Sequence, residues 1–450
     1  MPPMRSNFRE FWGGLDLNKK KIAQGFVWVG LFAFFGKFAG AAKEMAIAWR
    51  YGISSEVDAY VFLFSLVNVP ISIWFSVLAV VLVPLIAENL QEKNTSLYKF
   101  QRELFGVAVA VGVVLLLISW FLIPIIMESS KLGMSNQVIT NVNEMVVGLS
   151  LVAPIGIMIS VLSAWMLAYG RHTNTLFEAV PAIIILGFVL VPPAGVNQPL
   201  VWGTVFGFGL HLVLLAAALN FKGNLNHQIP SFSFSSPIWS GFWGAAGVIA
   251  IGQGLIALSG VIDQLFAARL GDGALSTLSF SGRILALILG IGAMAIARAT
   301  LPVFSKLNVD SRGNTITLAW FWGKIMLIFG IGVSLLFWAC APNLVKILFE
   351  RGAFTAADTV EVYRVLRASL FQIPFYFSGL VFYSLFSSMQ KYKVVACVLA
   401  ISISIKCIII FPLANKFGLS GIQVSNAFMY FFFVVLQIII LKFKFLESSK

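Results

Sequence analysis

The chain has 450 residues, of which 59% are hydrophobic and 11% are charged, and its mean hydropathy is +0.92. No water-soluble domain of this size sustains such a composition, so the sequence predicts an all-α polytopic membrane protein without a sizeable soluble domain. The net charge of +13 does not indicate a nucleic-acid partner, because basic cytoplasmic loops and a few cations inside the membrane account for it.

Twelve apolar segments, the fifth of them short, approach the length of about 20 residues that a membrane-spanning helix needs. The predicted spans cover residues 22–49, 59–87, 104–127, 145–168, 176–191, 200–220, 238–270, 275–304, 318–340, 365–388, 394–413 and 419–441. The first segment is too long for a signal-peptide core and no small-residue cleavage site follows it, so we expect it to remain as a span.

The lysines and arginines indicate how the chain is oriented. If the N-terminus is cytoplasmic, 17 of them fall in the tails and loops on the inner side and 7 in the outer loops and their immediate borders. Because cytoplasmic loops carry the excess of positive charge, both termini are predicted to be cytoplasmic. The other seven fall within the predicted spans.

A short motif occurs twice in the chain, as EMAIAWRYG from Glu44 to Gly52 and as DQLFAARLG from Asp263 to Gly271. The repeat indicates two related halves of six spans, and an even number makes them parallel repeats, as in transporters that bind substrate between two lobes. The predicted domains are a cytoplasmic basic tail (1–21), an N-terminal six-helix lobe (22–220), a cytoplasmic linker (221–237), a C-terminal six-helix lobe (238–441) and a cytoplasmic tail (442–450).

Charged residues inside the spans are candidates for function, because an ionised group in a bilayer usually faces a partner or a watery cavity. In the first span, Lys37 and Glu44 lie about two helical turns apart on one face. A structural pair and an anion site both remain open for them. Arg283 follows the outer turn by about 12 Å of helix, and its planar fork of N–H donors suits a diphosphate. Arg298 lies near a span end, where snorkelling to the interface also explains it.

Two aspartates are candidates for a charge pair or for binding a coupling ion or proton, namely Asp58 and Asp263. Asp58 has the alternative role of a helix N-terminal acid favoured by the helix dipole. Three further cations within the spans are weaker candidates, namely Lys324, Arg367 and Lys406. The histidines lack metal-ligand spacing, and neither a catalytic motif nor a phosphate loop is visible. The sequence therefore predicts no metal, no cofactor and no enzymatic activity.

Three segments resemble the MviN/MurJ lipid II flippases of the multidrug, oligosaccharidyl-lipid and polysaccharide exporter superfamily. They are FGKFAGAAKEMAIAWRYGISSEVDAY (35–60), the stretch 263–306, and LFERGAFTAADT (348–359), which is the most specific. The resemblance implies an inner-membrane flippase that moves an undecaprenyl-diphosphate-linked saccharide from the inner to the outer leaflet by alternating access. The implied partners are that lipid-linked saccharide, membrane lipids and a coupling ion or proton.

The resemblance also bears on individual residues. Lys37 and Lys43 stand where the family has arginines, Asp58 matches a family aspartate, and Arg283 matches a cavity arginine. Together with Arg298, the three cations form the predicted substrate-binding set. The predicted charge-pair or coupling set is Glu44, Asp58 and Asp263.

Two departures from the family keep an exopolysaccharide or O-antigen exporter open. After Asn68 the chain has Pro70 and Ser72 where the family usually has charged residues, and twelve spans are two fewer than lipid II flippases commonly have.

A multidrug cation antiporter would want an acidic cavity, which the seven cations within the spans disfavour. A polysaccharide polymerase would need large polar outer loops or acidic catalytic motifs. A transport-inactive scaffold stays open.

Overall fold

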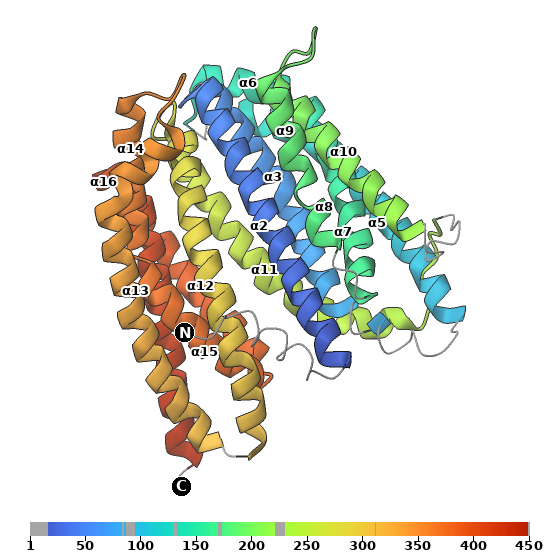
Figure 1. The fold of residues 1–450 in the computed structure, drawn as a ribbon, viewed down its shortest axis with the longest axis vertical. Helices are drawn as coiled ribbons and strands as arrows, with labels where there is room; N and C mark the ends of the chain where they lie inside the picture. Colours follow the sequence, from blue (N-terminus) through green and yellow to red (C-terminus); the bar gives the residue numbers. More distant parts are fainter. Residues whose placement is uncertain are drawn as a thin grey trace, which may run out of the picture. The chain divides into compact units, whose positions relative to one another are not determined.

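The computed structural model describes residues 17–82, 85–86, 95–128, 133–169, 173–220, 230–310 and 312–448 (Figure 1). All the regular elements in these ranges are helical, which confirms the predicted all-α fold. They are α2 (Leu17–Tyr51), α3 (Ser55–Val77), the π-helical turn η1 (Leu78–Leu82), α5 (Thr95–Glu128), α6 (Asn136–Leu149), α7 (Val152–Ala168), α8 (Thr173–Phe177), α9 (Val180–Leu190), α10 (Pro199–Asn220), α11 (Ile238–Ala268), α12 (Ala274–Asp310), α13 (Arg312–Phe349), α14 (Ala356–Leu370), α15 (Ile373–Ser388) and α16 (Tyr392–Ser448). Most of the predicted basic tail, and residues 221–229 of the predicted linker, lie outside the described residues.

Each of the twelve predicted spans overlaps at least one helix in the described part of the chain. Within the described residues, eight helices are long and apolar enough to cross a membrane, or ten if each of two bent helix pairs forms one span. The bent pairs are α6 with α7, at 47°, and α14 with α15, at 40°. Helix α2 covers the first predicted span. Helix α16 covers the last two, and Gly418, with a φ of 59°, interrupts it between them.

The chain divides into two compact units. The first contains Met1–Ala46, Leu78–Val114 and Leu151–Trp239, and the second contains Ile47–Val77, Leu115–Ser150 and Ser240–Lys450. The lobe boundaries expected from the sequence remain a prediction.

The glycines that close the repeated motif have the same local role. Gly52 follows the end of α2 with a φ of 58°, and Gly271 follows α11 with a φ of 111°. Positive φ values after a helix favour glycine, because a Cβ atom is disfavoured in that conformation. The repeat therefore preserves a helix-ending glycine.

The segment LFERGAFTAADT forms the turn between α13 and α14, and its glycine allows close backbone packing. The Ala353 N–H donates a hydrogen bond of 2.8 Å to the Trp49 carbonyl at the end of α2. A Cβ atom at Gly352 would lie 2.3 Å from the same carbonyl, and one at Gly52 would lie 2.6 Å from the Ala353 carbonyl. Neither glycine tolerates a larger side chain without moving this contact.

The same segment starts helix α14. The Thr355 hydroxyl accepts a hydrogen bond from the Asp358 N–H, and the Asp358 carboxylate accepts one from the Thr355 N–H. This capping box satisfies N–H groups that the first turn of a helix leaves open. Phe354 is buried edge-on against Phe280 of α12. The segment that most specifically resembles the flippase family therefore has a packing role in this unit.

Helices α12 and α13 both pack closely against α15 in the second unit. A Cβ atom at Gly292 of α12 would lie 2.2 Å from the Phe377 ring, and one at Gly330 of α13 would lie 2.6 Å from the Pro374 backbone. Small residues let helix backbones approach, which is the usual packing device of membrane helices. These contacts fix α12, the helix that carries Arg283.

Glu103 is the most extensively hydrogen-bonded carboxylate in the described part of the first unit. Its side chain on α5 has no exposed surface. It accepts hydrogen bonds from the Ser233 hydroxyl (2.8 Å), from the hydroxyl and N–H of Ser235 (2.9 and 3.1 Å), from the Ser236 N–H (3.1 Å) and from the Trp239 indole (2.7 Å). The carboxylate thereby anchors the residues that precede α11 to α5.

Replacing Glu103 by alanine is expected to lower the free energy of unfolding by about 3 kcal/mol or more, because five donors lose a charged acceptor. The free energy of unfolding of Glu103→Gln should lie between those of the native chain and of Glu103→Ala, because glutamine retains one carbonyl oxygen. Thermal unfolding of the detergent-purified chain measures the change. Glu128→Ala, at the exposed end of the same helix, should leave the melting temperature unchanged, and equal melting temperatures for both alanine variants would contradict this anchoring role.

Candidate functional site

A cavity of about 460 Å³ lies in the second unit, between α3, α11 and α12, with one residue from α16. On α3, its lining residues recur at the three- and four-residue spacing of one helix face. Gly260 on α11 and Gly282 on α12 leave open space, because a Cβ atom there would meet nothing within 4 Å. The polar residues of the lining are Ser65, Asn68, Ser72, Asp263, Gln264, Ser279, Arg283 and Gln423.

Arg283 and Asp263, two of the candidates from the sequence, both line this cavity. Arg283 lies about 14 Å of helix beyond the start of α12, and its side chain is exposed. The Ser65 hydroxyl donates a hydrogen bond to the Gln264 amide oxygen, which joins α3 to α11 in the wall. The cavity thus combines one guanidinium with several amide and hydroxyl groups.

Asp263 is paired with a cation that the sequence ranked as a weak candidate. The Lys406 ammonium nitrogen lies 2.7 Å from Asp263 Oδ1, and the Asn426 amide donates a 2.8 Å hydrogen bond to Oδ2. The Lys406 side chain has no exposed surface, and that of Asp263 is 14% exposed. The sequence signal for Lys406 was its depth within a predicted span. The partner could not be inferred, because it lies 143 residues away.

Asp58 holds the start of helix α12. Its side chain is 1% exposed. Oδ2 accepts a 2.6 Å hydrogen bond from the Gly273 N–H, and Oδ1 accepts two of 2.6 Å from the N–H and hydroxyl of Ser276. The first N–H groups of a helix need such acceptors, and the helix dipole favours a negative charge there. Asp58 lies in the first turn of α3, as the sequence indicated, and its carboxylate in addition accepts hydrogen bonds from the first N–H groups of α12.

The other candidates are not among the residues that line this cavity. Lys43 and Glu44, in the first unit, form an ion pair of 2.7 Å with side chains 15% and 11% exposed, while Lys37 in the same helix is exposed. Glu44, the acid on the same helix face as Lys37, thus pairs with Lys43, its neighbour in the chain. Arg298 is exposed on α12, about 22 Å of helix beyond Arg283, and is not among the cavity-lining residues.

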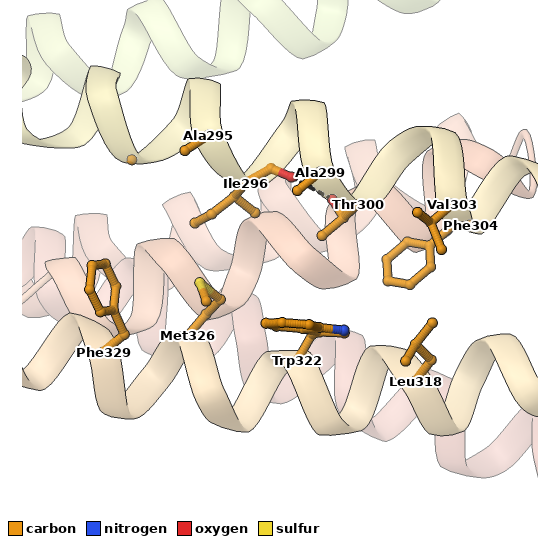
Figure 2. A pocket seen from close by; sticks show the side chains of 11 residues that line it. Ala295, Ile296, Ala299, Thr300, Val303, Phe304, Leu318, Trp322, Met326 and Phe329 are labelled. Atoms are coloured by element: carbon orange, nitrogen blue, oxygen red, sulfur yellow. Dashed lines mark hydrogen bonds between the residues drawn. The ribbon is translucent and has the colours of Figure 1, made fainter. Parts of the chain in front are cut away.

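A second, apolar groove of about 370 Å³ lies between α12 and α13 (Figure 2). In Figure 2, Ile296 and Val303 of α12 and Trp322 of α13 point into it. The Thr300 hydroxyl donates a 2.8 Å hydrogen bond to the Ile296 carbonyl, so it is satisfied by its own helix. Since the described lining carries no charge, the groove suits a hydrocarbon chain.

Within the residues that the structure describes, no group of three or more histidine, cysteine, aspartate or glutamate residues could hold a metal ion. The cavity lining carries guanidinium, amide, hydroxyl and paired carboxylate groups.

Comparisons with known proteins agree with this architecture. Residues 47–448 match the family described as lipid II flippase MurJ. A probable lipid II flippase of Thermotoga maritima is 25% identical over 432 residues, covering 89% of this chain and 81% of that protein. One of Buchnera aphidicola is 23% identical over 372 residues, covering 79% and 71%.

Solved structures show the same fold. A lipid II flippase MurJ in an inward closed conformation superposes with a TM-score of 0.77 at 17% identity, covering 92% of this chain and 87% of that one. An inward-facing multidrug resistance MATE family transporter of the MOP superfamily gives a TM-score of 0.67 at 16% identity, covering 90% and 92%. With the family match over most of its length, the chain belongs to the lipid II flippase MurJ family of multi-pass inner-membrane transporters, and it is not an enzyme.

Proposed function

We propose that this chain moves lipid II, a polyprenyl-diphosphate-linked saccharide, from the inner to the outer leaflet by alternating access, with both termini cytoplasmic. The observation that carries the proposal is Arg283 in the wall of the cavity between α3, α11 and α12. A guanidinium donates two parallel hydrogen bonds to one phosphoryl group, and it stays charged at any physiological pH.

The charge balance of the cavity favours an anionic ligand. Asp263 and Arg283 are the charged residues among those that line it. The negative charge of Asp263 is compensated at 2.7 Å by Lys406, which is buried. Arg283 adds a positive group to the cavity lining, which suits a diphosphate better than the organic cations that a multidrug antiporter carries.

The other polar residues suit the saccharide. Asn68, Gln264 and Gln423 present side-chain amides to the cavity, and each amide both donates and accepts hydrogen bonds, as sugar hydroxyl and acetamido groups require. An exopolysaccharide or O-antigen unit would share the diphosphate and the lipid chain. Family membership favours lipid II, and no contact described above favours the alternative.

The remaining predicted residues have supporting roles in this proposal. Lys37, Lys43 and Arg298 supply further positive charge for the diphosphate along its route, outside the cavity described above. Asp58 positions Arg283, because it holds the N-terminus of the helix that carries it. Glu44 neutralises Lys43 until the diphosphate of the substrate competes with Glu44 for the lysine.

The apolar groove between α12 and α13 fits the polyprenyl chain of the same substrate. Its first lining residue on α12, Gly292, lies about 14 Å of helix beyond Arg283, so one helix carries both the cation and the groove. Apolar chains bind by burying surface, at about 25 cal/mol per Å². The surrounding lipid bilayer competes with the groove for the polyprenyl chain. The role of the groove is therefore to guide this chain while the head group crosses.

Arg283→Ala should reduce the rate of lipid II flipping in reconstituted vesicles by about tenfold to a hundredfold, because a charged hydrogen bond contributes about 1.5–3 kcal/mol. Arg283→Lys should retain part of the activity, since the charge remains without the fork. Arg364→Ala removes an exposed arginine of α14 outside the cavity and should flip normally. Full activity of Arg283→Ala, with insertion verified, would remove this residue from the mechanism.

Ala299→Trp should obstruct the groove and slow the flipping of lipid II with its full polyprenyl chain more than that of a short-chain analogue. Leu301→Trp is the matched control, because Leu301 is exposed on the same helix and does not line the groove. The comparison uses the ratio of the two flipping rates in each variant. An unchanged ratio in Ala299→Trp would show that the groove does not guide the polyprenyl chain.

A further inference from the structure

Lys406 provides a fully buried ammonium group in the second unit. Three oxygens lie within 3.0 Å of its nitrogen, namely Asp263 Oδ1 (2.7 Å), Ser259 Oγ (2.7 Å) and the Ser259 carbonyl (3.0 Å). An ammonium has three N–H donors, so the number of nearby oxygens matches the number of donors. The nitrogen thus occupies an oxygen-lined position as a bound cation would.

The surrounding groups are oriented to hold a positive charge. The Ser259 hydroxyl donates to the Met429 sulfur at 3.6 Å, which leaves its lone pairs to face Lys406. Asn426 donates to the second oxygen of Asp263 at 2.8 Å. An isolated charge buried in this way would be costly, whereas a paired and hydrogen-bonded one is tolerated.

The cluster links three helical segments beside the cavity. Ser259 and Asp263 lie on α11, Lys406 lies on the first arm of α16, and Asn426 lies on its second arm, beyond the break at Gly418. Asp263 also lines the cavity that contains Arg283. The charge at this position therefore joins α11 to both arms of α16.

We propose that the Lys406 ammonium is a built-in cation that fills the oxygen site formed by Ser259 and Asp263, so that flipping by this chain requires no diffusible cation at that site. The transport part of this inference rests on the proposed function. Its cation-binding part does not, because the site consists of residues whose contacts are independent of any substrate.

Removal of the ammonium should convert the site into one that takes an alkali cation. In Lys406→Ala, the carboxylate of Asp263 and the two Ser259 oxygens are left around a vacated volume, and oxygens of this kind are the ligands that hard cations prefer. Sodium chloride should therefore raise the melting temperature of this variant by several degrees over choline chloride at equal ionic strength, since a ligand that binds only the folded state stabilises it. The native chain should show no difference between the two salts.

The matched control is Lys416→Ala, which removes an exposed lysine from the same helix and should respond to neither salt. Asp263→Asn combined with Lys406→Met removes both charges of the pair, and replacing a buried pair by uncharged groups is often tolerated. This double variant should fold and should also ignore sodium, because the carboxylate that would bind it is gone. A sodium response of the double variant equal to that of Lys406→Ala would overturn the assignment.

Flipping assays complete the test. The native chain should flip lipid II equally fast in sodium and choline vesicles, whereas Lys406→Ala should be slow in choline and at least fivefold faster in sodium. A native chain that loses most of its flipping in choline would overturn the inference, as would a folded Lys406→Ala that sodium neither stabilises nor reactivates. If the native chain flips no lipid II at all, the proposed function fails, while the melting-temperature comparison still decides the cation site.

Discussion

Charge inside an apolar environment must be compensated, and this constraint shapes the chain more than any other. An ionised carboxylate without partners costs several kcal/mol in such surroundings. Asp58, Glu103 and Asp263 all meet the constraint with partners far along the chain. Asp58 joins α3 to α12, Glu103 joins α5 to the segment before α11, and Asp263 joins α11 to α16. Each buried acid therefore acts as a fixed joint between helices that hydrophobic packing alone would align only loosely.

These joints also determine the electrostatics of the cavity. Because Lys406 compensates Asp263 from within the protein, the carboxylate adds little negative potential to the cavity that it lines. Because Asp58 fixes the first turn of α12, Arg283 is held at a set depth along that helix. The result is a polar cavity whose lining includes a guanidinium, and the same helix α12 also lines a groove without charge. A diphosphate carrying a sugar and a hydrocarbon chain has the matching chemistry.

Local patterns in the sequence were sufficient for much of the fold. Apolar length predicted the helices, and the glycines that close the repeated motif, Gly52 and Gly271, both have positive φ values. Arg283 was a candidate from its depth, its planar fork of donors and the family resemblance, and it lines the cavity. The sequence could not identify Lys406 as the partner of Asp263, or the serines that hold Glu103, because those contacts join residues more than 100 positions apart. Helical spacing relates residues only within a few turns, so such pairs emerge only when the helices are packed.

The lipid-linked intermediates of the native cell report directly on whether lipid II is the substrate. The chain would be depleted, and the polyprenyl-diphosphate saccharides of the inner membrane would be extracted, identified by mass spectrometry and quantified by leaflet. We expect lipid II to accumulate several-fold in the inner leaflet while other lipid-linked glycans stay at their normal levels. Unchanged lipid II together with accumulation of a different polyprenyl-linked glycan would contradict it.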